Sequence, residues 1–198
     1  THPIEKLFEV YNAGGKTFGE NKVQDLVHKH TEMPKDIKWH FIGHLQRNKV
    51  KYIAPFVTLI HAVDSIKLLN EIDKQAKKHN RIISCLLQVH IAEEEGKFGF
   101  SYSELGNIFA SDELQSLNNI RIEGLMGMAT NTNNIDTITK EFKQLSTFFK
   151  ECQKYSAKNV AINTLSMGMS SDYQLAIECG SNMIRVGSSI FGARNYAK

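Results

Sequence analysis

The stretch SMGMSSDYQLAIECGSNMIRVGSSIFG, residues 166–192, contains one complete strand–turn–helix–strand unit. Two Ser/Gly-rich turns flank a helical phrase in which Ser171 and Gln174 match a capping box and Gly180 is placed to end the helix. The run MIRVGSSIFG (183–192) is mostly apolar and predicts a buried strand. This order of elements is typical of a βα repeat with parallel strands.

The same alternation continues toward the start of the chain. Most strand candidates are continuous apolar runs without clean alternation, as expected for parallel strands covered on both faces. Between them lie helices with recognisable N-terminal signals at Asn21 (with Gln24), Ser65, Ser101 and Asn134. The predicted strands span residues 16–21, 38–45, 58–64, 83–92, 120–129, 163–169 and 183–192.

These strands are compatible with two architectures, a doubly wound open sheet or a barrel that lacks one strand. The first recognisable element, THPIEKLFEVYNAG (1–14), is a predicted helix with Pro3 in its first turn and Gly14 after it. A βα repeat that opens on a helix is expected to have lost the strand before it. We therefore predict an α/β fold, a TIM-type (β/α)8 barrel in a single domain over residues 1–198, with an N-terminal strand and helix outside the sequence.

Composition narrows the class of protein further. The chain has 198 residues, 41% hydrophobic and 23% charged, which is ordinary for one globular domain. A net charge of +3 and short basic runs such as KQAKK argue against a nucleic-acid partner. Nothing resembles a membrane span or signal peptide, which predicts a cytoplasmic protein without membrane contact. Cys85, Cys152 and Cys179 are too widely spaced for a metal or disulfide pattern and predict reduced, buried thiols.

The two Ser/Gly-rich turns predict a phosphate site. In TIM barrels the phosphate of a ligand commonly binds at the loops after strands 7 and 8. With the missing strand counted as the first, SMGMSSD follows strand 7 and RVGSS lies at strand 8. One such loop is adequately explained as a turn, whereas two at the expected places favour an anion site. The candidate groups are Ser166, Gly168, Ser170, Gly187, Ser188 and Ser189.

Arg185 is the charged residue inside the last apolar run. Because side chains alternate along a strand, it points opposite to Ile184 and Val186 and faces the barrel interior if those two pack on helices. Burying a guanidinium is costly unless it meets polar or anionic partners. Two explanations remain open, a structural ion pair, for example with Glu123, and a ligand acceptor near the phosphate site.

Three further polar residues fall near strand ends. Asn21 either caps the following helix or lines a ligand at the end of its strand. His40 and His44, in WHFIGHLQRNK, are predicted to share a strand face, where histidines are usually hydrogen-bonded structural groups. Neither a metal-ligand spacing nor a catalytic group is indicated.

Five phrases together resemble one known family. FGENKVQ, WHFIGHLQRNK, KFGF, GLMGMA and LSMGMSSDYQLAIECGSNMIRVGSSIFGAR are similar, in order and over almost the whole chain, to the YggS/PROSC family. These are the pyridoxal 5′-phosphate (PLP) homeostasis proteins, single-domain relatives of the barrel domain of alanine racemase. The resemblance implies a PLP-binding barrel without a second domain.

The resemblance also implies roles for particular residues. In the family a lysine in a phrase like SKT-x-P forms a Schiff base with PLP, which places it immediately before Thr1. By the same resemblance Arg185 faces the pyridine nitrogen, and Lys97 stands where racemases carry an arginine. The implied cofactor-binding residues are Asn21, Met128, Ser166, Ser170, Arg185, Gly187 and Ser188.

An arginine at the pyridine nitrogen makes PLP a weaker electron sink, because the guanidinium only donates hydrogen bonds. Racemases add an acid/base tyrosine from a second domain that this sequence lacks. We therefore predict a non-catalytic, monomeric protein that buffers PLP or delivers it to apo PLP-dependent enzymes. The alternatives are a PLP-dependent amino-acid racemase and, more distantly, a sugar-phosphate barrel enzyme without PLP.

Overall fold

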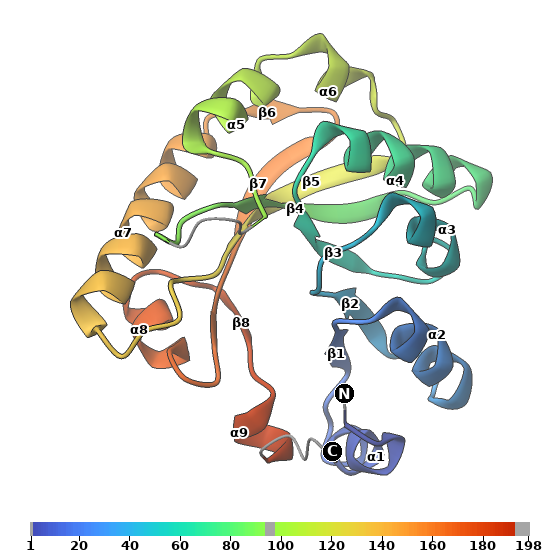
Figure 1. Cartoon of the computed structure of the whole chain (residues 1–198). Helices are drawn as coiled ribbons and strands as arrows, with labels where there is room; N and C mark the ends of the chain where they lie inside the picture. The colour runs from blue at the N-terminus through green and yellow to red at the C-terminus, as the bar shows by residue number, and fades with distance from the viewer. Residues whose placement is uncertain (1, 94–97, 193–198) are drawn as a thin grey trace.

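The computed structural model describes residues 2–93 and 98–192 of the chain (Figure 1). The strands are β1 (Thr17–Glu20), β2 (Lys38–Phe41), β3 (Leu59–Val63), β4 (Ile83–Val89), β5 (Ile120–Gly127), β6 (Ser156–Ala157), β7 (Val160–Met169) and β8 (Met183–Arg185). The helices are α1 (Ile4–Asn12), α2 (Val23–Glu32), η1 (Arg47–Lys49), α3 (Val50–Ile53), α4 (Ile66–Lys78), α5 (Tyr102–Phe109), α6 (Asp112–Ser116), α7 (Ile135–Cys152), α8 (Tyr173–Glu178) and α9 (Ser188–Phe191).

The strands form one curved sheet with the helices on its outer side (Figure 1). The pairs β1–β2, β2–β3, β3–β4, β4–β5, β5–β7 and β7–β8 are all parallel. The short β6 is antiparallel to β7. The sheet is thus nearly closed, and the predicted α/β TIM-type barrel is confirmed. Within the described residues β1 forms one edge, and at the other edge β7 pairs with β6 near its start and with β8 near its end; a further strand between β8 and β1 stays a prediction.

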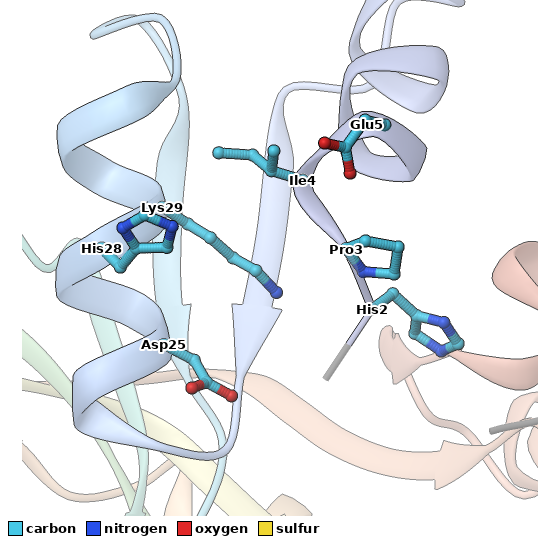
Figure 2. Close-up of a pocket in the computed structure, with 7 residues that line it drawn as sticks. All are labelled: His2, Pro3, Ile4, Glu5, Asp25, His28 and Lys29. Atoms are coloured by element: carbon cyan, nitrogen blue, oxygen red, sulfur yellow. The ribbon is translucent and has the colours of Figure 1, made fainter. Parts of the chain in front are cut away.

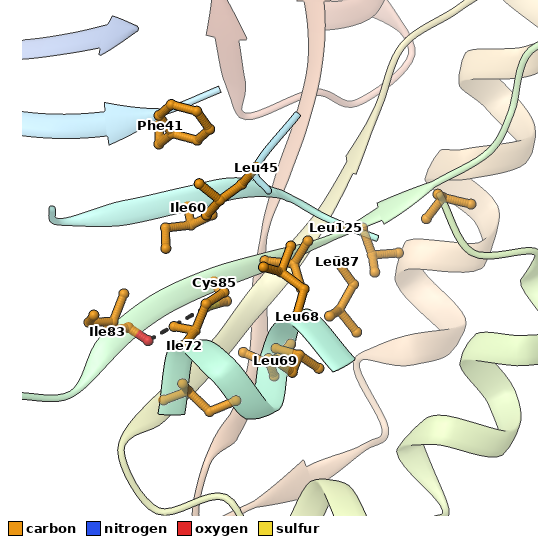
Figure 3. Packing of buried hydrophobic residues seen from close by; sticks show 14 of the residues in the cluster. Phe41, Leu45, Ile60, Leu68, Leu69, Ile72, Ile83, Cys85, Leu87 and Leu125 are labelled. Atoms are coloured by element: carbon orange, nitrogen blue, oxygen red, sulfur yellow. Dashed lines mark hydrogen bonds between the residues drawn. The ribbon is translucent and has the colours of Figure 1, made fainter. Parts of the chain in front are cut away.

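The two faces of the sheet bury different clusters. The large outer cluster lies between strands and helices, and Figure 3 shows Leu68 and Leu69 of α4 packed near Leu87 of β4. A smaller cluster on the inner face joins Leu86 to a few neighbours. Leu86 and Leu87 therefore point to opposite faces, as continuous apolar runs predict. The inner cluster consists of Leu59, Ala62, Leu86 and Met126, with Met128 and Met183 packed against it.

The last predicted strand is wrong in its second half. β8 ends at Arg185, and α9 begins at Ser188 after Gly187. The hydroxyl of Ser170 accepts hydrogen bonds from the backbone N–H groups of Gly187 (3.0 Å) and Ser189 (3.3 Å) and so holds the start of this turn. An apolar run alone does not distinguish a buried strand from a short strand followed by one helical turn.

Three of the five predicted helix caps are confirmed. Ser65 and Asn134 cap α4 and α7 through their side chains, and Ser101 forms a complete capping box at α5. Two other predicted caps, at Asn21 and Ser171, are wrong. The N-cap residues of α2 and α8 are Lys22 and Asp172, each one position later, and neither makes a side-chain hydrogen bond to its helix.

The end of α8 and the cysteines follow the sequence predictions. Gly180 comes shortly after α8 with φ +99°, a backbone conformation that glycine adopts without strain. Cys85, Cys152 and Cys179 are free and buried. In the parts of the chain that the structure describes, no helix has the length and apolarity needed to cross a bilayer.

An ion pair is buried on the outer side of the barrel wall. Glu20 at the end of β1 is paired with Lys29 of α2, and each side chain is only 6% exposed. A cavity of about 400 Å³ opens beside Lys29, between α1 and α2 (Figure 2). At the other edge of the sheet, α9 approaches the chain start, where the rings of His2 and Phe191 stack with centroids 5.0 Å apart.

Candidate functional site

The two Ser/Gly-rich loops meet at the carboxyl ends of β7 and β8. Ser170, directly after β7, binds the backbone of Gly187 and Ser189, which follow β8. The Ser189 hydroxyl donates back to the Ser170 carbonyl at 3.4 Å. The predicted juxtaposition of these loops is therefore present, with the N–H groups of Gly187 and Ser189 both directed to the Ser170 hydroxyl.

Gly168 allows the turn after β7 to pack closely. Its φ of +95° lies in the left-handed region, and a Cβ added there would lie 2.6 Å from the Cβ of Ala176 in α8. Any larger residue would push α8 away from β7. The glycine therefore brings the helix against the strand that carries Ser166 and ends just before Ser170.

Arg185 extends across the inner face of the sheet toward β7 and β5. Its Nη1 donates to the Ser166 carbonyl (2.9 Å) and hydroxyl (2.7 Å), and its Nη2 donates to the Gly127 carbonyl (3.0 Å). The suggested ion pair with Glu123 is not formed, because Glu123 instead accepts a hydrogen bond from Ser84 at 2.6 Å. Burial lowers the pKa of Arg185 to about 10, with a smaller opposing effect of Asp172, so the group stays cationic at neutral pH.

Two histidines continue this polar chain into the barrel. The Nδ1 of His61 lies 3.0 Å from the Ser166 hydroxyl, and its Nε2 lies 3.0 Å from the Nδ1 of His40. His40 is thus a hydrogen-bonded histidine, as predicted. Sequence reasoning missed His61, although a single histidine inside the apolar run TLIHAVD was a usable signal.

Both of these histidines are neutral at physiological pH. Burial is the main cause that lowers the pKa of His61 well below 6.5, and the nearby His40 and Arg185 act in the same direction. Burial, with a smaller contribution from Lys38, lowers the pKa of His40 to about 4. The polar chain therefore carries one positive charge, on Arg185.

His44 does not share a strand face with His40, because β2 already ends at Phe41. Instead, the Nδ1 of His44 lies 3.1 Å from a carboxylate oxygen of Asp64, and its ring stacks on Phe98 at 3.7 Å between centroids. The two histidines therefore belong to different environments.

The remaining predicted residues also lie at strand ends. Asn21 follows β1 with an exposed side chain, and Met128 follows β5 and packs on the inner cluster. Ser188 is the exposed first residue of α9. Lys97 and the position before Thr1 lie outside the described residues. A role for these residues in cofactor binding remains a prediction.

Two other kinds of site receive no support. Among residues 2–93 and 98–192, no group of three His, Cys, Asp or Glu side chains is placed to hold a metal ion. The cavity in Figure 2 is lined by residues of α1, α2 and the chain start, and none of the predicted cofactor residues borders it. The chemistry therefore concentrates at the carboxyl ends of β7 and β8.

A nearly closed parallel barrel with two joined Ser/Gly loops and an inward arginine at strands β7 and β8 is an arrangement typical of (β/α) barrels that bind a phosphate-bearing ligand. The sequence profile of the alanine racemase N-terminal domain matches residues 1–195. The pyridoxal phosphate homeostasis protein of Aquifex aeolicus is 39% identical over 197 residues, which cover 99% of this chain and 85% of the relative. The chain belongs to this family of pyridoxal phosphate homeostasis proteins, within the alanine racemase N-terminal domain group.

Solved structures agree with this assignment. PipY of Synechococcus elongatus without PLP is 35% identical, with a TM-score of 0.89 over 97% of this chain and 89% of PipY. The structure of PipY with PLP bound is 34% identical, with a TM-score of 0.85 over the same shares of the two chains. The resemblance stated from the sequence motifs is therefore confirmed.

Proposed function

We propose that this chain binds PLP at the carboxyl ends of β7 and β8 and acts in PLP homeostasis, as a buffer or carrier of the cofactor. The observation that carries the proposal is the Arg185 guanidinium, held by Ser166 and Gly127 next to the joined Ser/Gly loops. The family membership and the PLP-bound PipY structure support the same ligand.

The donors at this site fit the chemistry of PLP. Arginine has five N–H donors, and the described residues accept from its two terminal nitrogens, so Nε–H and one Nη2 hydrogen remain for a ligand. An unprotonated pyridine nitrogen is an acceptor of the required kind. The N–H groups of Gly187 and Ser189 already donate to the Ser170 oxygen, so the hydroxyls of Ser170 and Ser188 are the groups that would donate to a phosphate here. The proposed contacts are those of Asn21, Met128, Ser170, Arg185, Gly187 and Ser188. Ser166, whose fully buried hydroxyl contacts Arg185 and His61, would act on the ligand through Arg185.

PLP supplies an aldehyde for linkage to an amine and an electron-withdrawing ring. Arg185 would hold the ring by donating a hydrogen bond to the pyridine nitrogen, and the guanidinium would keep its proton. This arrangement weakens the electron sink and favours storage of the cofactor over turnover. We propose further that the protein is a monomer and is not an enzyme. Apo PLP-dependent enzymes would receive its cofactor. The relationship to alanine racemase keeps a racemase as the second candidate.

Transfer of the cofactor is the first testable consequence. The full-length protein, loaded with PLP and mixed with the apo form of a PLP-dependent enzyme, is expected to restore the activity of that enzyme. Restoration should persist when a scavenger removes free PLP. No transfer under this condition would refute the carrier role. Conversion of L- to D-amino acids above a heat-killed control, measured by chiral chromatography, would instead favour the racemase.

Ser170 provides a matched test of the site in the same assay. Ser170→Ala removes the hydroxyl that joins the two loops and is expected to weaken PLP binding about tenfold. This is the usual loss of affinity when one hydrogen bond at the binding site of a charged ligand is removed. Ser116→Ala is the control, because among the described residues the Ser116 hydroxyl donates to the Glu113 carbonyl within α6 and takes no part in the two loops. Equal affinities of the two variants would place the phosphate elsewhere.

The covalent anchor is a separate prediction. The residue immediately before Thr1 is expected to be a lysine linked to PLP. Borohydride reduction of the loaded protein, followed by digestion and mass spectrometry, should place the cofactor mass on that lysine. Reduction of the ligand-free protein is the control. Modification at another lysine, or none at all, would contradict the prediction.

A further inference from the structure

The chain of contacts from Arg185 does not end at Ser166 but continues through His61 to His40. His61 is 1% exposed and Ser166 is fully buried, so neither side chain reaches bulk solvent. The contacts connect β8, β7, β3 and β2 across the inner face of the barrel. A buried polar chain of this kind is costly unless every donor and acceptor is satisfied.

One arrangement of protons satisfies all its members. Arginine only donates, so the Ser166 hydroxyl oxygen accepts from Arg185. Among the described contacts the hydroxyl proton then has one acceptor, the Nδ1 of His61. The Nε2 of His61 therefore carries its proton and donates to the Nδ1 of His40. In the other neutral form of His61 the Ser166 hydroxyl proton has no acceptor.

We infer that His61, supported by His40, is a positioning residue that fixes the direction of the Ser166 O–H bond and so keeps a lone pair of the Ser166 oxygen directed to Arg185. The guanidinium is thereby held in one orientation, with its remaining N–H groups directed to the ligand. The inference rests on the proposed function in one respect, that Arg185 faces the cofactor ring. It assigns to the two histidines a role in ligand recognition that acts entirely through Ser166.

A double-mutant cycle separates this role from ordinary packing. His61→Leu keeps the side-chain volume and removes the acceptor, so PLP binding is expected to weaken about tenfold, because a buried hydroxyl loses its partner. In a Ser166→Ala background the same change should alter PLP affinity less than about twofold, the usual limit for uncoupled sites. His79→Leu, at the exposed end of α4, is the control and should bind as the parent does.

A measurement on the ligand-free protein gives an independent readout. The N–H signals of the Arg185 guanidinium, identified by their loss in Arg185→Leu, should exchange slowly with water in the parent. In His61→Leu and Ser166→Ala they should exchange faster. If His61→Leu does not fold, His61→Asn and His61→Gln replace it. Asparagine places its amide oxygen near the position of Nδ1 and should preserve slow exchange, whereas glutamine should not.

The outcomes distinguish this inference from the proposed function. Equal losses of affinity from His61→Leu in both backgrounds, or equal exchange rates in the Asn and Gln variants, would overturn the positioning role. So would unchanged PLP affinity in His61→Leu when Arg185→Leu binds weakly, and that result would leave the cofactor site intact. Unchanged affinity in Arg185→Leu would refute the placement of PLP at Arg185, and guanidinium exchange would still decide whether His61 orders the arginine.

Discussion

Lys29→Met is expected to lower the free energy of unfolding by about 3–5 kcal/mol, because it leaves the carboxylate of Glu20 buried without its partner. Both side chains of this pair are 6% exposed, so neither charge is well solvated. The loss of stability comes mainly from leaving one charge buried and unpaired, since the attraction within the pair is little larger than the free energy of desolvating its two charges. Urea unfolding followed by circular dichroism measures the loss directly.

The control for this prediction replaces both ions. Glu20→Leu combined with Lys29→Met removes the charges together and should recover most of the lost stability. The cavity beside Lys29 suggests the opposite outcome, in which water enters the cavity, solvates the carboxylate of Glu20 in the single variant and keeps the loss of stability small. A loss below about 1 kcal/mol in the single variant, the range of solvated pairs, would show that this explanation is correct.

Gly124→Ala is expected to destabilise the barrel by about 3 kcal/mol or more, at or beyond the upper end of the usual cost of overpacking. A Cβ at position 124 of β5 would lie 1.7 Å from the carbonyl oxygen of Thr164 in β7 and 2.6 Å from its carbonyl carbon. Both obstructing atoms are backbone, so relief requires β5 and β7 to separate. The irregular register between Ile122 and Gly124 lies at the same place.

Gly106→Ala is the control for Gly124→Ala, because it makes the same substitution at a glycine with open space around it. Gly106 lies within α5, and an added Cβ would meet nothing within 4 Å. This variant should gain about 0.5–1 kcal/mol, because alanine loses less backbone entropy than glycine in a helix. Opposite signs for the two glycines are therefore expected in thermal and urea unfolding. A Gly124→Ala protein that unfolds with the parent's midpoint would show that β5 and β7 tolerate a wider separation.

The sequence was most informative where local patterns and global structure agree. Continuous apolar runs correctly predicted parallel strands covered on both faces, and the two Ser/Gly loops were predicted to meet because parallel strands align their carboxyl ends. Boundaries were less predictable. The run that contains Arg185 changes from strand to helix within three residues. The hydrophobic pattern of the run does not predict that change.

The candidate site was predictable only in part. Arg185 was recognised because a charge in an apolar run is conspicuous, yet two explanations for it remained open until its hydrogen-bond partners were known. His61 escaped notice because its significance depends on Ser166, a partner 105 residues away. Asn21 was given a helix cap that it does not make, since the helix starts one residue later than the pattern indicated.

The separation between His61 and Ser166 has a consequence for the order in which the protein acquires its binding capacity. Their contact spans 105 residues, and Arg185 lies a further 19 residues along the chain. During synthesis the ribosome releases β2 and β3 long before the segment that bears Arg185. Contacts of such long range also pay the largest loop-closure entropy and tend to form late. A nascent chain is therefore expected to retain the cofactor only after the segment with Arg185 and the loop behind it has emerged.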